Sequence, residues 1–313
     1  MKIYTNVQRC ILISTSLLFV ACGGVKPLNK AEKSESKDTT TKEGQDWTQT
    51  IQPQNLTIRP GEATLLRVPG DFKVGGSLSC AGKEFKYFVR GEELISFISE
   101  SYFSKLKPYE CHYFSKEEQK GEKVKVADVQ VKIKEFPSER LKVDKKRVFL
   151  SKKNQKRAAK ERKLRNKAYA GSPERPLFFE PFKLPIDTIV TSIYGSRRVF
   201  NKKKQTQHLG TDYRAAVGAP IKAANRGKVV LSRNFFYTGH TIILDHGLGI
   251  FTMYGHLSKR NVQEGEVVPR GTVIGLAGKT GRVTGPHLHW GVTVNGFAIE
   301  GDSLIRASEE MPQ

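Results

Sequence analysis

Six of the seven histidines in this 313-residue chain lie between positions 208 and 289, and this concentration constrains the fold more than any other feature. From Pro181 onward, short apolar runs alternate with glycine turns, a pattern typical of β-strands. A β-sheet presents side chains from several strands on one surface, because alternate residues of a strand point to the same face. The sequence therefore predicts a mainly β fold in which these histidines meet in one cleft.

Two motifs give this stretch the composition of a metal site. His208 and Asp212 are four residues apart, and Gly210 between them allows the backbone to bend so that both side chains face one point. His287 and His289 are separated by one residue. On a strand, both of these imidazoles point to the same face while the intervening leucine enters the core.

Nitrogen and oxygen ligands of this kind suit zinc. Two histidines and one aspartate make the open three-ligand site of zinc hydrolases, in which the metal activates a water molecule in the fourth position. With His256 as a further candidate, two histidines are then left to assist in proton transfer and charge stabilisation.

The stretch from about residue 184 to about residue 304 resembles the lysostaphin/LytM-type zinc metallopeptidases of peptidoglycan. The resemblance rests on several motifs that occur in the order and spacing of that family. These are Tyr194-Gly195-Ser196-Arg197-Arg198, the HxGxD at His208 to Asp212, Gly218-Ala219-Pro220-Ile221-Lys222-Ala223, Gly227-Lys228-Val229-Val230, Asp245-His246-Gly247-Leu248-Gly249, Tyr254-Gly255-His256-Leu257-Ser258, Gly271-Thr272-Val273-Ile274-Gly275, Thr280-Gly281-Arg282-Val283-Thr284-Gly285 and the HxH at His287 to His289.

The resemblance implies a role for each of the five side chains. It implies that His208, Asp212 and His289 bind one zinc ion per chain, and that His256 and His287 are the catalytic histidines. It also implies a LytM-type antiparallel β-sheet metallopeptidase domain with the site in an open groove between loops. The expected chemistry is attack of a metal-activated water on a peptide bond, assisted by the two histidines that are not ligands.

Two departures from the family lie outside these five positions. Trp290-Gly291 follows the HxH where many members have Phe-Glu, and Ile299-Glu300-Gly301-Asp302 replaces the usual Asn-Pro. The Trp290-Gly291 variant resembles Gram-negative members, which favours a D-alanyl–diaminopimelate cross-link over a glycine bridge as the substrate.

The resemblance thus predicts a zinc-dependent endopeptidase that hydrolyses the peptide cross-links of bacterial peptidoglycan. The alternative is a non-catalytic LytM-like activator of another cell-wall hydrolase. Activators of that type typically lose ligands or catalytic histidines, whereas all five positions are filled here. A third hypothesis is an envelope-binding protein whose working parts are the N-terminal β module and a basic connector.

Residues 1–21 have the features of a lipoprotein signal peptide. Lys2 and Arg9 precede an apolar run that is too short for a permanent membrane helix, and the run ends in Leu18-Phe19-Val20-Ala21-Cys22, which resembles a bacterial lipobox. We expect lipidation of Cys22, with ordinary signal cleavage as the alternative. The expected location is the cell envelope, at the periplasmic face of the outer membrane, with a membrane anchor through Cys22; export argues against nucleic acid as a partner.

The polar residues 22–50 predict a disordered tether, because they cannot bury enough apolar surface to offset the entropy of ordering. Residues 51–140 contain short β-favouring runs separated by Pro-Gly and Gly-Gly turns, which predicts a small β-sandwich, with an immunoglobulin-like arrangement as one form. In an oxidising compartment Cys80 and Cys111 are expected to form a disulfide, with two free thiols as the alternative.

A basic segment joins this region to the predicted zinc metallopeptidase domain at residues 176–313. The chain carries a net charge of +22, and residues 142–167 hold 13 Lys and Arg against two acids, Asp144 and Glu161. Residues 151–169 lack Gly and Pro, which predicts a helix within a basic linker at 141–175. This segment is either a solvated linker or a contact with an anionic wall or lipid surface.

Overall fold

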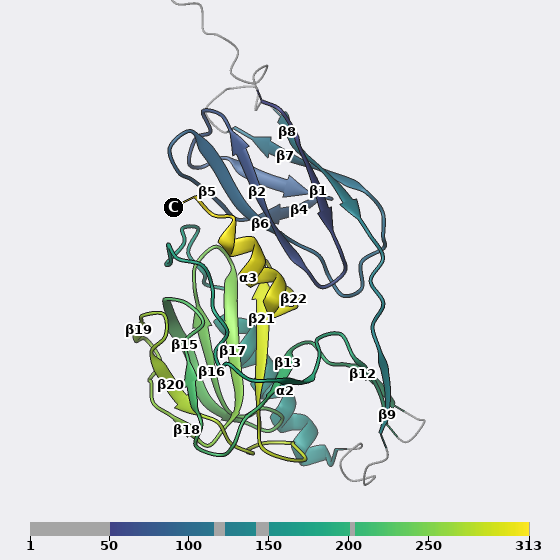
Figure 1. Ribbon diagram of the computed structural model, residues 1–313, viewed down its shortest axis with the longest axis vertical. Coiled ribbons are helices and arrows are strands. Elements are labelled where there is room, and N and C mark those ends of the chain that lie inside the picture. The colour runs from purple at the N-terminus through teal and green to yellow at the C-terminus, as the bar shows by residue number, and fades with distance from the viewer. Residues whose placement is uncertain (1–50, 116–122, 142–149, 201–203, 313) are drawn as a thin grey trace, which may run out of the picture. The chain divides into compact units, whose positions relative to one another are not determined.

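The computed structural model describes residues 51–115, 123–141, 150–200 and 204–312 (Figure 1). These residues belong to one compact unit, Gly44–Gln313. The predicted signal peptide, the lipidation site Cys22 and the predicted tether at 22–50 lie outside the described residues. Of the described helices, none is long and apolar enough to cross a membrane.

The predicted mainly β fold is confirmed, and its N-terminal part consists of two sheets. A five-stranded sheet has the order β1-β8-β7-β3-β4, with β1 parallel to β8, and a three-stranded sheet has the order β2-β6-β5. Their strands are β1 (Gln54–Ile58), β2 (Ala63–Pro69), β3 (Ser77–Cys80), β4 (Lys83–Phe85), β5 (Tyr87–Val89), β6 (Glu93–Ser99), β7 (Tyr109–Phe114) and β8 (Lys123–Val131). Cys80 on β3 and Cys111 on β7 are paired in register and joined by a disulfide.

The three-stranded sheet is buried on both faces, which explains the nearly continuous apolar run of β6. Leu94 and Ile98 pack into the core between the two N-terminal sheets. Ile95 and Phe97 point the opposite way and belong to the core of the C-terminal region. Because successive residues of a strand face opposite sides, one strand serves both cores. The N-terminal sandwich therefore shares a hydrophobic core with the region that carries the histidines.

The C-terminal region is built on an eight-stranded antiparallel sheet (Figure 1). The order is β10-β13-β21-β17-β16-β15-β19, and β22 pairs with β21. These strands are β10 (Val190–Ser192), β13 (Thr211–Arg214), β15 (Gly227–Phe235), β16 (Gly239–Asp245), β17 (Ile250–Leu257), β19 (Val267–Val268), β21 (His287–Val294) and β22 (Phe297–Ile299). A small sheet with the order β14-β20-β18 adds β14 (Pro220–Lys222), β18 (Lys259–Arg260) and β20 (Val273–Leu276).

Two helices complete the described fold. The basic segment forms α2 (Lys152–Ala168), capped at its start by Ser151, whose hydroxyl accepts from the Asn154 amide. The last helix, α3 (Gly301–Glu309), contacts β2 of the sandwich, and the Ala63 amide donates to the Ser303 hydroxyl across this contact at 3.0 Å.

The predicted limit of the N-terminal domain at residue 140 falls inside a strand that pairs with the C-terminal region. β9 (Ser138–Leu141) runs parallel to β11 (Arg197–Phe200), which in turn pairs with β12 (Lys204–Gln207). Such a pairing links residues that are distant in sequence, so composition alone does not reveal it. The segment that follows the sandwich is therefore part of the structure beside the histidine stretch.

Candidate metal and catalytic site

Three neighbouring strands bring the predicted residues together. Asp212 on β13 is paired with His289 on β21, and His289 is paired in turn with Gly255 on β17, the residue before His256. His208 lies just before β13, four residues ahead of Asp212. The pairing of strands, more than local sequence, therefore assembles the site.

The HxH motif behaves as its spacing predicts. Leu288 is fully buried in the core, while His287 and His289 on either side of it point toward Asp212. His289 Nδ1 lies 2.8 Å from Asp212 Oδ1, and His287 Nε2 lies 3.8 Å from the same oxygen. Both imidazoles thus face one carboxylate, but at different distances.

His208 Nε2, Asp212 Oδ1 and His289 Nδ1 form a compact triangle, which we call the ligand triangle. Its sides are 3.0 Å from His208 to Asp212, 2.8 Å from Asp212 to His289 and 3.1 Å from His289 to His208. In a tetrahedral site with zinc–ligand bonds of about 2.0–2.1 Å, ligand atoms are about 3.3 Å apart. Among the described residues this is the one group of three with the spacing of a metal site, and its two imidazoles and one carboxylate suit zinc.

Groups around the triangle fix the orientation of its members. His208 Nδ1 lies 3.2 Å from the Ile193 carbonyl, which accepts its proton and directs Nε2 to the triangle. Arg198 Nη2 donates to Asp212 Oδ2 at 3.1 Å and to the Ser192 hydroxyl at 2.8 Å. Asp212 therefore offers Oδ1 to the triangle while Arg198 binds its other oxygen, a contact that sequence reasoning missed.

The chain bends at Gly210, as predicted, and the glycine has a second role. Its backbone is not in the left-handed region that would call for a glycine. Instead, a Cβ at this position would lie 2.5 Å from His289 Cε1 and 2.7 Å from His289 Nε2. The glycine is needed because the His289 ring packs directly against the backbone between His208 and Asp212.

His256 and His287 lie beside the triangle with their ring centroids 4.7 Å apart. His256 Nδ1 is 2.9 Å from the Thr280 carbonyl, and His287 Nδ1 is 3.0 Å from the Gly285 carbonyl. A carbonyl oxygen only accepts, so each Nδ1 carries the proton and each neutral ring keeps a lone pair on Nε2. His256 also has a φ of 63°, a conformation that non-glycine residues seldom adopt.

The surroundings of Asp212 and His256 shift both pKa values downward, which leaves the carboxylate charged and the imidazole neutral. Burial alone would raise the pKa of Asp212, but hydrogen bonds and positive charge from His208 and His289 hold that pKa well below its usual range. Burial, together with repulsion from His289 and His287, lowers the pKa of His256 to about 3. The site thus pairs an ionised carboxylate with an imidazole that is neutral at physiological pH.

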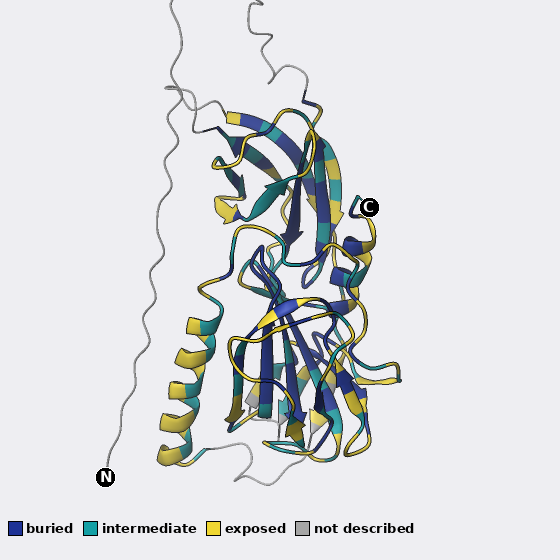
Figure 2. Ribbon diagram, turned by 90° about the vertical axis from the view of Figure 1, so that its left-hand side faces the viewer, coloured by how far each residue is buried: buried dark blue, intermediate teal, exposed yellow. Residues whose placement is uncertain are grey.

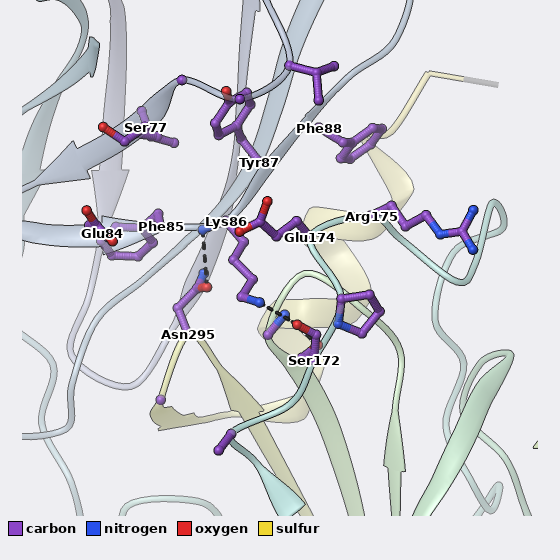
Figure 3. A pocket seen from close by; sticks show the side chains of 18 of the residues that line it. Ser77, Glu84, Phe85, Lys86, Tyr87, Phe88, Ser172, Glu174, Arg175 and Asn295 are labelled. Atoms are coloured by element: carbon purple, nitrogen blue, oxygen red, sulfur yellow. Dashed lines mark hydrogen bonds between the residues drawn. The ribbon is translucent and has the colours of Figure 1, made fainter. Parts of the chain in front are cut away.

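A large cavity lies away from the ligand triangle (Figure 3). It has a volume of about 840 Å³ and is bounded by β4 and β5 of the sandwich, the segment 169–175 and the turn after β21. The Lys86 ammonium there donates to the Ser172 carbonyl. None of the five candidate residues lines this cavity, so ligand geometry, and not cavity size, identifies the site.

Comparison with protein families places the same residues in one domain. Residues 206–300 match the model of Peptidase family M23, which spans all five candidate positions. This stretch of the chain is therefore an M23 (LytM-type) peptidase domain.

Curated relatives agree over this stretch. The chain is 41% identical over 120 residues to the peptidoglycan DD-endopeptidase ShyA of Vibrio cholerae, a match that covers 37% of this chain and 28% of ShyA. It is 37% identical over 106 residues to the DD-carboxypeptidase/endopeptidase Mpg of Neisseria meningitidis, covering 34% of this chain and 24% of Mpg. The chain thus spans less than a third of the length of these relatives.

A solved structure extends the similarity beyond the M23 domain. A Pseudomonas aeruginosa protein described as an M23 peptidase superposes with a TM-score of 0.60 and 27% sequence identity. The superposition covers 79% of this chain and 95% of that one. The shared fold therefore includes a large part of the N-terminal region as well.

Proposed function

We propose that this chain is a zinc-dependent endopeptidase that hydrolyses the peptide cross-links of bacterial peptidoglycan. The observation that carries the proposal is the convergence of the ligand triangle with two further imidazoles, His256 and His287. The M23 match supports the reaction class, and the names of ShyA and Mpg support peptidoglycan as the substrate. A D-alanyl–diaminopimelate bond joins two D-configured centres, which is consistent with a DD-endopeptidase.

We infer that the ligand triangle holds one zinc ion, which in such sites polarises a water molecule and the carbonyl of the bond to be cut. The protein holds the triangle ready for the metal. The Ile193 carbonyl fixes the tautomer of His208, and Arg198 keeps one oxygen of Asp212 engaged. The negative charge on Asp212 favours a cation at this point, because its low pKa keeps the carboxylate ionised.

We assign the proton transfers to the two histidines outside the triangle. His287 Nε2 lies 3.8 Å from Asp212 Oδ1, beside the ligand triangle, and there its lone pair would take a proton from the attacking water. His256 carries its proton on Nδ1, which the Thr280 carbonyl accepts, so its Nε2 can only accept a proton at first. The proton released by the attacking water would reach the leaving amine through Nε2 of one of these two rings. Burial and repulsion from His289 and His287 lower the pKa of His256, which keeps its Nε2 unprotonated until such a transfer.

The test is mass spectrometry of the muropeptides that the full chain releases from purified sacculi. The full chain is used because the N-terminal sandwich shares a core with the peptidase domain. A His287→Ala variant and a chelator-treated sample serve as inactive controls, and an Asp245→Asn variant serves as a matched control outside the site. We expect new monomeric muropeptides from the wild type and from Asp245→Asn, and none from the other two samples.

The masses of the released muropeptides identify the bond that is cut. Release of fragments with free D-alanine and diaminopimelate ends would support the proposed cross-link. If the zinc-loaded wild type releases nothing from sacculi, but stimulates another wall hydrolase added to them, the enzyme proposal fails and the non-catalytic activator takes its place.

A further inference from the structure

The helix α2 presents a dense array of cations. It contains nine Lys and Arg and a single acid, Glu161. No residue of the helix is fully buried, and its sequence lacks an apolar stripe that would hold it in a conventional core. A solvated linker helix and a docking surface share these features, so the manner in which α2 is attached to the domain decides between them.

A narrow stripe of small and polar residues attaches α2 to the sheet. Partial burial recurs at positions 154, 158, 161, 165 and 168, the three- and four-residue spacing of one helix face, and this face lies along β15. Figure 2 shows the consequence, with the outward surface of the helix exposed along its length. The exposed residues include Lys152, Lys153, Lys156, Arg157, Lys160, Arg162, Lys163 and Lys167. We call these eight residues the basic face.

Two contacts hold the helix in this orientation. The Glu161 carboxylate accepts from the Phe236 amide at 2.8 Å and from Arg157 Nε at 2.7 Å. At the end of the helix, the ring of Tyr169 packs on Phe251 with centroids 4.8 Å apart. The one acid of the helix is thus turned to the sheet, and within the helix it pairs with Arg157, so the seven lysine and arginine residues that remain in the basic face have no acidic partner in α2 itself.

The same contact links α2 to the turn that pairs with the His256 backbone. Phe236 is followed by Tyr237 and Thr238, and the Thr238 carbonyl accepts from the His256 amide at 2.6 Å. Arg282 stacks on the Tyr237 ring, with its guanidinium carbon 5.3 Å from the centroid. Arg282 thus adds a cation at the 236–238 turn, which lies between α2 and the end of the strand that carries His256.

We propose that the basic face of α2 docks the carboxylate-bearing strand of peptidoglycan that the histidine site cuts. This proposal rests on the proposed function, because peptidoglycan is the substrate assigned there. The stem peptides of that polymer carry free carboxylates, so the strand is a polyanion with charge complementary to the basic face. A polymer seated on α2 would pass the 236–238 turn and present its cross-links to His256 and His287, which raises the local substrate concentration.

The test compares two full-length variants that lose the same charge at different places. The first replaces four lysines of the basic face (Lys156→Gln, Lys160→Gln, Lys163→Gln and Lys167→Gln). The control replaces four exposed lysines of the N-terminal sandwich and the segment after it (Lys105→Gln, Lys107→Gln, Lys123→Gln and Lys132→Gln). Binding to purified sacculi is measured by co-sedimentation in chelator, where no bond is cut.

We expect the α2 variant to bind sacculi at least about tenfold more weakly than the wild type, and the control to change less than about threefold. Added salt should remove most of the wild-type binding to sacculi, and it should reduce the difference in sacculus affinity between the α2 variant and the control. With metal present, the α2 variant should cut a small soluble cross-linked muropeptide at the wild-type rate but cut intact sacculi more slowly.

The failure of this proposal can be told apart from the failure of the proposed function. Equal binding of both variants to sacculi would overturn the docking surface, whether or not the chain cuts peptidoglycan. If the α2 variant no longer binds vesicles containing phosphatidylglycerol but still binds sacculi as the wild type does, the docking proposal fails and the basic face contacts a lipid surface instead. A binding difference between the variants in a chain that cuts no muropeptide would leave the surface standing and contradict the enzymatic proposal.

Discussion

Aspartate and histidine side chains lie at both ends of the strands of the eight-stranded sheet, and the two groups differ in how their polar atoms are satisfied. At the far end from the ligand triangle, Asp245 Oδ1 accepts from the Ser172 hydroxyl at 2.6 Å and from the Gly247 amide at 2.9 Å. His246 is fully buried, with Nδ1 2.8 Å from the Arg226 carbonyl and Nε2 2.7 Å from the Thr252 hydroxyl. Both nitrogens of this ring are used inside the fold.

At the triangle, the same residue types behave differently because their atoms converge. The nitrogens of His208 and His289 meet one oxygen of Asp212, and the Nε2 of His287 points at the same oxygen. The pKa of Asp212 is held low by these partners, whereas burial raises the pKa of Asp245. In the proposed site several imidazole nitrogens point at one carboxylate oxygen. In the structural pair each polar atom has its own hydrogen-bond partner within the fold.

The largest expected effect comes from the histidines beside the triangle. Replacement of His287 by Ala should lower kcat/KM on cross-linked muropeptides by about 10²–10⁴-fold, because it removes the proposed proton acceptor without touching a ligand. Zinc content should stay at the wild-type level. The matched change at the other end, His246→Gln, should reduce kcat/KM by no more than a few-fold; a larger loss would mean that the two ends are coupled.

A smaller effect is expected from Arg198, which binds the outer oxygen of Asp212. The Arg198→Met variant should weaken zinc binding by about 10–100-fold, the usual cost of losing a group that orients a metal ligand. Competition with a chromogenic chelator measures this affinity directly and does not depend on activity. Arg233→Met, which removes an exposed ion pair with Glu264, is the control and should leave the zinc affinity unchanged.

The smallest effect concerns the pH dependence of stability at the structural end. Burial lowers the pKa of His246 to about 4, so the unfolded chain takes up a proton at this residue before the folded chain does. The stability from this residue is complete above the unfolded pKa of about 6.5 and is lost as the pH falls toward 4. At pH 5 the loss should be on the order of 1–2 kcal/mol relative to pH 8.

Denaturant unfolding at pH 8 and pH 5 measures this dependence. The His246→Gln variant should be less stable at pH 8 and should lose less stability on acidification than the wild type. Equal losses in both proteins would show that His246 does not titrate in this range.

The sequence predicted which side chains meet in the site, but it did not predict the neighbouring groups that hold them in place. The HxGxD and HxH spacings predicted four of the five side chains, His208, Asp212, His287 and His289, because the period of a strand and the chemistry of zinc ligands are both local properties. His256 was predicted separately, from the Tyr254-Gly255-His256-Leu257 motif. The contact between Arg198 and Asp212 was missed, since it depends on how β11 is placed beside β13. The bend at Gly210 was predicted, but the close packing of His289 against it was not, because His289 comes from another strand.

In the fold, too, features set by local sequence were predicted, and contacts between distant segments were not. The apolar runs predicted strands and a sandwich in the N-terminal region, and the lack of Gly and Pro predicted the helix at 152–168. The sequence did not reveal that β6 serves two cores, or that β9 pairs with β11, because both facts depend on contacts between distant segments. Nor did it show that Glu161 turns α2 so that its basic face lies outward.

The most direct test of the account is the zinc content of the full chain and of two aspartate variants, measured by elemental mass spectrometry after dialysis. We expect about one zinc per chain in the wild type and in Asp245→Asn, and less than a tenth of that in Asp212→Asn, because only Asp212 contributes an oxygen to a shared point. A wild type without zinc, or Asp212→Asn with a full complement, would contradict the assignment of the ligand triangle.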